Sequence, residues 1–176
     1  MLNSSRILLR EVRESDLNPS YVNWLNDSEV NSFLETRFIP QSIESIRAYW
    51  QNHRDAVHSP WFAIELIDRH QHIGNIKLGP IDWVHRRADI SLFIGDKASW
   101  GKGYASEAIS LISKWAFNQL DLYKLSAGMY ATNIGSRRAF EKAGFVLEAT
   151  FKDELYSSGS RVDMWRMGLL RPAFDG

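Results

Sequence analysis

The chain has 176 residues, of which 44% are apolar and 24% charged, and its 21 basic residues balance its 21 acidic residues. This length suits one domain, residues 1–176, and the neutral balance leads us to expect neither nucleic acid nor a membrane as a partner. The sequence contains no cysteine, which excludes disulfides and thiolate chemistry. The first residues lack a signal-peptide pattern and the apolar stretches are too short to span a bilayer, so we expect a cytoplasmic protein.

The order of predicted elements is typical of a mixed α/β domain. Short apolar or alternating runs predict strands, and apolar residues three and four positions apart predict helices. In chain order we predict a strand at 7–12, a helix capped at 15–16 and running to 25, a short helical piece at 27–34, a helix opening at 40–42, strands at 61–67, 73–78 and 88–94, a helix from 105 to 116, a strand at 124–130, a helix from 133 to 143, and strands at 145–151 and 161–169.

The segment Gly101-Lys102-Gly103 lies between a predicted strand and the helix with the clearest apolar stripe. Such a junction gathers unpaired backbone N–H groups at the positive end of a helix dipole, which suits a phosphate, although a plain connection has the same pattern. A nucleotide-triphosphatase loop needs Ser or Thr where Gly103 stands, and the dinucleotide fingerprint needs glycine where Ser106 stands. Both of these phosphate loops are therefore excluded.

Two motifs in the second half of the chain resemble those of the GNAT N-acetyltransferase superfamily. The segment 100–108, Trp-Gly-Lys-Gly-Tyr-Ala-Ser-Glu-Ala, is similar to its acetyl-CoA-binding motif. The segment 133–145, an Asn-x-x-Ser run ending in Glu-Lys-Ala-Gly-Phe, is similar to its second cofactor motif. With the element order, the resemblance covers residues 7–169, and it points to the branch that resembles ribosomal-protein N-terminal and amino-sugar-nucleotide acetyltransferases.

The resemblance implies a single-domain α/β fold and acetyl-CoA as the acyl donor. The expected sheet is mixed and mostly antiparallel, with a central splayed parallel strand pair and helices on both faces. The strand ending at 92–94 would hold the pantetheine arm, the loop 101–105 the pyrophosphate, and Asn133 the pantetheine, with Arg138 or Lys102 at the outer phosphates. The residues implied for cofactor binding are Leu92, Phe93, Ile94, Trp100, Gly101, Lys102, Gly103, Tyr104, Ala105, Asn133, Ser136 and Arg138.

One position departs from the family pattern. The tyrosine that often protonates the departing thiolate would fall at Phe140, which has no acidic proton. A thiol with a pKa of about 8.5 is a tolerable leaving group, so water could complete this step.

The reaction implied is attack of a neutral amine on a thioester, which requires a proton acceptor. Asp89 shares a strand face with Ser91 and Phe93 and could act through a water, or it could merely pair with a neighbouring arginine. His85 is a second candidate base, although it lies in a polar turn where solvated residues are common. Tyr130 or Tyr156 could supply a phenol. The histidines show no ligand pattern, so we expect no metal.

The amine acceptor would be bound by the first helices and by the loops between strands. Aromatic rings could stack on the acceptor and polar groups could fix hydroxyls or a cation, although core packing explains the aromatics equally well. The candidates are Trp24, Asn26, Glu29, Phe33, Asp82, Trp83 and Tyr156.

Three function hypotheses follow. The first is a small-molecule N-acetyltransferase, with a nucleotide-linked amino sugar favoured and a polyamine or a protein N-terminal amine as alternatives. The second is a non-catalytic acyl-CoA-binding module, which Phe140 leaves open, and the third is an interaction domain with a vestigial loop. A homodimer is also left open.

Overall fold

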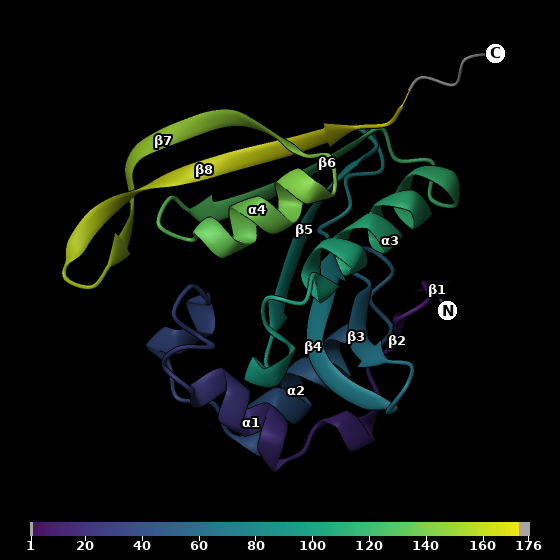
Figure 1. Ribbon diagram of the computed structural model, residues 1–176, viewed down its shortest axis with the longest axis vertical. Coiled ribbons are helices and arrows are strands. Elements are labelled where there is room, and N and C mark those ends of the chain that lie inside the picture. Colours follow the sequence, from purple (N-terminus) through teal and green to yellow (C-terminus); the bar gives the residue numbers. More distant parts are fainter. Residues whose placement is uncertain (1, 173–176) are drawn as a thin grey trace.

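Eight strands form one mixed sheet in the order β1-β2-β3-β4-β5-β6-β8-β7 in the computed structural model, which describes residues 2–172 (Figure 1). The strands are β1 (Leu2–Asn3), β2 (Ile7–Glu11), β3 (Trp61–Leu66), β4 (Gln71–Leu78), β5 (Arg87–Ile94), β6 (Lys124–Tyr130), β7 (Val146–Ser157) and β8 (Ser160–Leu170). The α-helices are α1 (Pro19–Asn26), α2 (Ile43–His53), α3 (Tyr104–Asn118) and α4 (Ile134–Lys142), and the short 3-10 helices are η1 (Glu14–Asp16), η2 (Glu35–Phe38) and η3 (Lys97–Ser99).

The central strands β5 and β6 form the one parallel pair of the described sheet, and they pair only at their beginnings. Their last paired residues are Asp89 and Ser126. On the outer sides, β5 stays paired with β4 as far as Ile94, and β6 stays paired with β8 as far as Tyr130. Because each strand follows its outer neighbour, the two separate towards their carboxyl ends. This confirms the expected mixed sheet with a splayed parallel pair.

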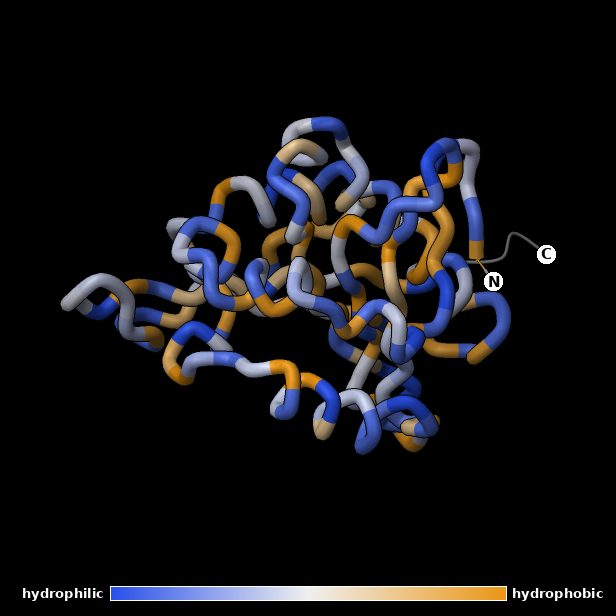
Figure 2. The backbone as a smooth tube through the Cα atoms, turned by 90° about the horizontal axis from the view of Figure 1, so that it is seen from below, coloured by the Kyte–Doolittle hydropathy of each residue, from blue (hydrophilic) through white to orange (hydrophobic). Residues whose placement is uncertain are grey.

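Two apolar clusters lie on opposite faces of the sheet, as the alternation of β3 shows. Ile64 and Leu66 join the cluster that holds α3, whereas Ala63 joins the cluster that holds α1 and α2. Successive side chains of a strand point to opposite faces, so a strand that is apolar at both sets of positions is covered on both. Figure 2 shows hydrophobic residues along the inner segments and hydrophilic residues in the outer turns.

The first helix begins later than the sequence predicts. Asn18, rather than Ser15 or Asp16, caps α1: its side-chain oxygen accepts a hydrogen bond from the N–H of Tyr21 at 3.2 Å, with Pro19 in the first turn. The carboxylate of Asp16 instead accepts two hydrogen bonds from the buried Arg10, at 2.7 and 2.8 Å. The Asp16 carboxylate, which the local sequence pattern assigns to the helix cap, is therefore paired with the buried Arg10 instead.

The predicted helical piece at 27–34 is wrong, because this segment forms turns and the short helix η2 follows it. Asp27 accepts hydrogen bonds from the N–H groups of Glu29 and Val30, at 2.9 and 3.2 Å. Such a side-chain turn competes with helix formation.

The strands β7 and β8 form a long hairpin that extends away from the rest of the molecule (Figures 1 and 2). The hairpin turns at Ser158 and Gly159, which both have positive φ, of 51° and 85°, as a tight hairpin turn requires. The strand β7 continues to Ser157, beyond the predicted end at 151. In residues 2–172, no helix combines the length and apolar character needed to cross a membrane.

Candidate active site

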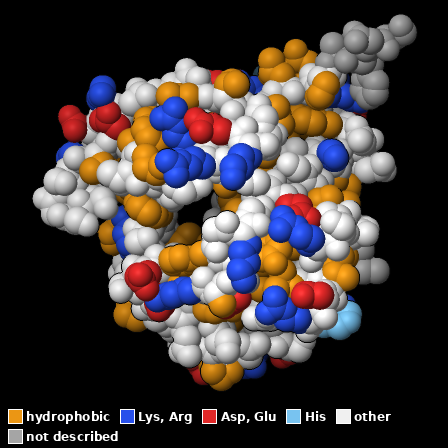
Figure 3. Space-filling model, viewed as in Figure 1, with side chains coloured by type: hydrophobic (Ala, Val, Ile, Leu, Met, Phe, Trp, Pro, Cys, Tyr) orange, Lys and Arg blue, Asp and Glu red, His pale blue; other side chains and the backbone are white. Residues whose placement is uncertain are grey.

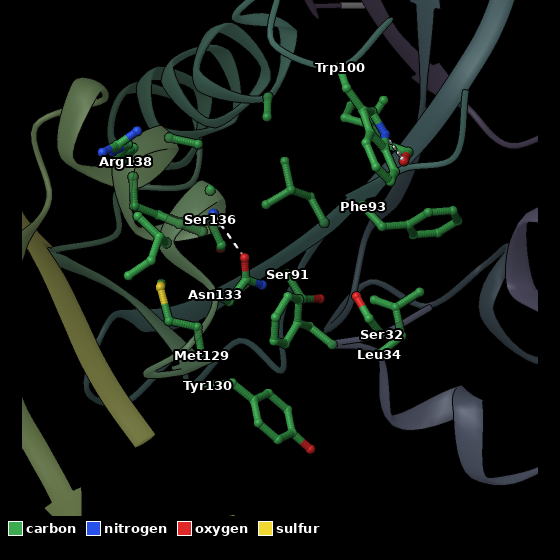
Figure 4. A pocket seen from close by; sticks show the side chains of 18 of the residues that line it. Ser32, Leu34, Ser91, Phe93, Trp100, Met129, Tyr130, Asn133, Ser136 and Arg138 are labelled. Atoms are coloured by element: carbon green, nitrogen blue, oxygen red, sulfur yellow. Dashed lines mark hydrogen bonds between the residues drawn. The ribbon is translucent and has the colours of Figure 1, made fainter. Parts of the chain in front are cut away.

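A cleft of about 1050 Å³ lies where β5 and β6 separate. Its walls come from the turns before η2, from β5, from the loop before α3, from β6, from α4 and from the β7–β8 hairpin. Figure 3 shows a hollow on this face of the molecule, with Lys and Arg side chains near its rim. Figure 4 shows Ser136 and Arg138 at one side of this space and Ser32, Leu34 and Tyr130 at the other.

The loop before α3 offers backbone donors to the cleft. Gly101 and Gly103 have φ of 73° and 86°, in the left-handed region that glycine adopts at little cost. Counting from Gly101 in the described chain, the first backbone N–H with an intramolecular acceptor is that of Glu107, which donates to the carbonyl of Gly103 at 3.1 Å. The preceding N–H groups at the positive end of the α3 dipole form a site suited to a pyrophosphate.

Two side chains fix the ends of this cofactor region. The indole Nε1 of Trp100 donates to the carbonyl oxygen of Ile94 at 2.8 Å, which ties the loop to the end of β5. The side-chain oxygen of Asn133 caps α4 by accepting from the N–H of Ser136 at 3.1 Å. The amide nitrogen of Asn133, on the other side of the group, therefore points into the cleft as a free donor (Figure 4).

The structure brings together the predicted cofactor residues from three separate elements: every one except Lys102 lines the cleft. Lys102 lies between two lining glycines, and its carbonyl oxygen accepts a hydrogen bond from Arg6 at 3.1 Å. The residue Arg6, about one hundred positions earlier, carries no sequence signal that could have linked it to this loop.

The other end of the cleft combines carboxylates with apolar side chains. Glu29, Phe33 and Glu35 line it together with Tyr130, which has Phe33 beside it at a ring-centroid distance of 5.8 Å. The hydroxyl of Tyr130 donates to Glu35 Oε1 at 2.7 Å and accepts from Arg37 Nη2 at 2.8 Å. Sequence reasoning missed Glu35, because only the fold places η2 beside the end of β6.

The pKa of Tyr130 is raised above its ordinary value of 10, first by burial and then by the neighbouring Glu35, while Arg37 opposes the shift. The phenol therefore keeps its proton at neutral pH. It can donate a hydrogen bond in the cleft, but it is not a base.

The other two predicted catalytic residues do not line the cleft. The carboxylate of Asp89 is held by both terminal nitrogens of Arg166 on β8, at 2.9 and 2.6 Å. Its partner is thus neither of the adjacent arginines that the sequence suggested. His85 lies in the exposed turn before β5, where its N–H donates to Asp82 Oδ1 at 2.9 Å.

Two predicted acceptor residues belong instead to the packing of α1. The indole of Trp24 lies directly over Gly95 and against His72, with a ring-centroid distance of 5.2 Å to that histidine. It lines a second, polar cavity rather than the cleft. The amide of Asn26 exchanges two hydrogen bonds with the backbone of Gln41, at 2.8 and 2.9 Å, which ties the end of α1 to the start of the α2 region.

Three further predicted acceptor residues also lie outside the cleft lining. Asp82 closes the turn before β5 through its bond to the N–H of His85. The indole Nε1 of Trp83 donates to His58 Nδ1 at 2.7 Å. Tyr156 lies on the β7–β8 hairpin with an exposed ring, and its carbonyl oxygen accepts from the Arg37 guanidinium at 3.2 Å.

Phe140 lines the cleft from α4 but is otherwise enclosed. Its side chain is 2% exposed and packs edge-to-face against Phe145, with ring centroids 5.0 Å apart. No proton can come from this position, so a donor for the leaving thiolate has to be water or another cleft residue.

Comparison with known proteins agrees with this geometry of the cleft. Residues 6–146 match the family model described as "Acetyltransferase (GNAT) domain". The uncharacterized N-acetyltransferase YoaA of Bacillus subtilis (strain 168) is 28% identical over 98% of this chain and 97% of its own length. The putative ribosomal N-acetyltransferase YdaF of the same organism is 32% identical, over 58% of this chain and 56% of its own.

Among solved structures, the spermidine N-acetyltransferase of Vibrio cholerae in complex with CoA and spermine superposes with a TM-score of 0.83 and 25% identity, covering 95% of this chain and 96% of that one. The fold, the splayed strand pair, the glycine loop and the family match agree. The chain therefore belongs to the GNAT family of acetyltransferases, whose acyl donor is acetyl-CoA.

Proposed function

We propose that this chain transfers the acetyl group of acetyl-CoA to a primary amine on a small aliphatic molecule that carries a second positive charge, as polyamines do. The observation that carries this proposal is that the carboxylates of Glu29 and Glu35 line the same cleft as the apolar side chains of Phe33, Leu155 and Met164. Glu29 also pairs with Lys97, and Glu35 Oε1 lies 4.0 Å from Arg37 Nη1, so an acceptor cation would share these carboxylates with the two side chains. Carboxylates attract the cation, and apolar walls accept the methylene chain. The similarity to a solved enzyme that binds spermine supports the same acceptor class.

For the donor, the backbone N–H groups of the loop 101–105 would carry the pyrophosphate, and Arg138 and Lys142, which both line the cleft, would meet the outer phosphates. The amide nitrogen of Asn133 would hydrogen-bond the pantetheine arm. The backbone N–H groups at the split between β5 and β6, which have no strand partner, would stabilise negative charge on the carbonyl oxygen of the thioester that acetyl-CoA supplies when bound.

For proton transfer, we place the acceptor at Glu35 and a hydrogen-bond donor at Tyr130. The amine nitrogen bonds to the acetyl carbon, the carbon–sulfur bond breaks, and the thiolate leaves with the electron pair. The proton lost by the nitrogen goes to the Glu35 carboxylate, directly or through a water, and the Tyr130 hydroxyl at 2.7 Å orients that carboxylate. Asp89 is less suited to this role, because Arg166 already holds both of its oxygens.

The test is acetyl-CoA-dependent thiol release with four acceptor classes: polyamines, aminated nucleotide sugars, aminoglycosides and N-terminal peptides. We expect turnover with polyamines, and we expect Glu35→Gln to lower kcat/KM for them by about 100-fold, the size of a general-base effect. Asp89→Asn is the matched control for loss of a carboxylate. Turnover with peptides alone would favour the protein N-terminal alternative, to which the similarity with YdaF points.

A non-catalytic acyl-CoA-binding module remains the alternative of another class, and the observation behind it is the enclosed Phe140. It predicts that calorimetric titration detects CoA binding while no amine of the panel releases thiol. That pair of results would refute the catalytic proposal. A homodimer stays a prediction, which sedimentation of the purified chain would test.

A further inference from the structure

An ion-pair network holds the glycine loop from behind, on the side away from the cleft. Arg6, in the turn between β1 and β2, donates from Nε to Glu107 Oε2 at 2.9 Å and from Nη1 to the carbonyl oxygen of Lys102 at 3.1 Å. Its Nη2 also pairs with Glu107, and the hydroxyl of Ser4 donates to the other oxygen of that carboxylate. The guanidinium carbon lies 4.9 Å from the ring centroid of Tyr104.

This contact fixes the orientation of one peptide group. In a trans peptide the C=O and the following N–H point in opposite directions. Arg6 holds the Lys102 carbonyl on the side of the loop away from the cleft, so the N–H of Gly103 has to point towards the cleft. In agreement, Gly103 lines the cleft and Lys102 does not. Rotation of this peptide changes ψ of Lys102 and φ of Gly103. Without that hold, Gly103 would allow the rotation at little cost, since glycine adopts both signs of φ.

We infer that Arg6 is a positioning residue for acetyl-CoA: by holding the Lys102 carbonyl, it keeps the Gly103 N–H directed at the pyrophosphate. This inference rests on the proposed function. It also explains a carboxylate near the positive end of α3, in a place where it would otherwise repel a phosphate. Glu107 is 18% exposed and serves as the anchor of Arg6, so its charge is neutralised where it stands.

Positioning and simple attraction by a nearby cation predict opposite results for Glu107→Gln. If charge alone mattered, removing a carboxylate would tighten binding of the anionic cofactor. If Arg6 acts through position, the same change releases the guanidinium and weakens binding. Likewise, Arg6→Lys keeps the positive charge but lacks the forked guanidinium that reaches both Lys102 and Glu107. Its affinity for CoA should therefore not exceed that of Arg6→Ala.

The experiment measures calorimetric dissociation constants for CoA, and for pantetheine by displacement of CoA, with wild type, Arg6→Ala, Arg6→Lys and Glu107→Gln. Pantetheine shares the arm of CoA but lacks the pyrophosphate. We expect each variant to raise the dissociation constant for CoA by about tenfold, the weight of one hydrogen bond to a charged group, and to leave that for pantetheine unchanged. Arg69→Ala, in an exposed pair on the β3–β4 turn, is the control and should change neither.

Other results would overturn the inference. These are full rescue by Arg6→Lys, tighter CoA binding by Glu107→Gln, equal weakening for CoA and pantetheine, or no change in any variant while wild type binds CoA. Failure of wild type to bind CoA would instead refute the proposed function, so the two failures are distinguishable. Circular dichroism and thermal melting of each variant show whether it is folded, and Arg6 is suited to substitution because its side chain is 48% exposed.

Discussion

The contact between Gly95 and Trp24 gives a sharp prediction, because Gly95 has no room for a side chain. A Cβ added there would lie 2.1 Å from Cδ2 and 2.4 Å from Cε3 of the indole. The ring cannot swing aside freely, since Tyr21 and His72 lie against it at centroid distances of 6.0 and 5.2 Å. The substitution Gly95→Ala should therefore displace α1 from the end of β5.

The expected cost can be worked from the two opposing effects. Overpacking of a rigid site costs about 1–3 kcal/mol, and a clash with ring atoms belongs at the upper end. Replacing glycine by alanine also restricts the unfolded chain, which by itself stabilises the folded state by about 0.4–1 kcal/mol. The net loss of stability is about 2 kcal/mol, which lowers Tm by about 4–8 °C for a domain of this size.

Differential scanning calorimetry of Gly95→Ala measures this loss. The matched control is Gly135→Ala in α4, where the nearest atom to an added Cβ is 3.9 Å away. Helix propensity predicts that this control gains about 0.5–1 kcal/mol. If Gly95→Ala melted at or above the wild-type temperature, the indole would not be fixed over Gly95, and the assignment of Trp24 to packing rather than to acceptor binding would be refuted.

Three further predictions concern buried and paired charges. Burial holds the pKa of His72 below its usual 6.5, so the unfolded chain binds a proton more readily than the folded chain. The contribution of His72 to stability is therefore complete above pH 6.5 and falls as the pH drops below it. The substitution His72→Gln should flatten this part of a curve of Tm against pH. Arg10→Met leaves the carboxylates of Asp16 and Glu65 buried without their cation, which should cost about 3–5 kcal/mol in urea unfolding, and a loss below 1 kcal/mol would contradict this. Asp89→Asn removes a half-exposed ion pair, so we expect a stability loss of at most about 1 kcal/mol and, at pH 6, an acetylation rate within about threefold of wild type; a hundredfold drop would return the proton acceptor to Asp89.

The phosphate loop and the helix behind it could be predicted from sequence because their signals are local. Glycine pairs, an apolar stripe with helical spacing and the Asn133 cap depend on residues within one or two turns of each other. The family resemblance placed the same residues on the donor side. In the structure, nearly all of these residues line the cleft, and they come from three elements.

The acceptor side could not be predicted in the same way. Trp24 lies in α1 and Phe33 in the turns that follow it, and both are aromatic, yet one packs over Gly95 and the other lines the cleft. Composition and spacing carry no information on which side of the sheet a turn residue comes to rest. Asp89 was placed on the correct strand, but its partner Arg166 is 77 positions away and is brought to it only by the β6–β8 pairing.

By itself, the sequence determined the elements with local signals, the one-domain α/β class and, through its two motifs, the acyl donor. The tertiary structure alone decided where β5 and β6 separate, that η2 brings Glu35 to Tyr130, and that Arg6 supports the glycine loop from behind. The physical reason is range: caps, periodicity and glycine turns act over a few residues, whereas a cleft forms where strands distant in sequence part. Which side chains line it depends on long-range packing.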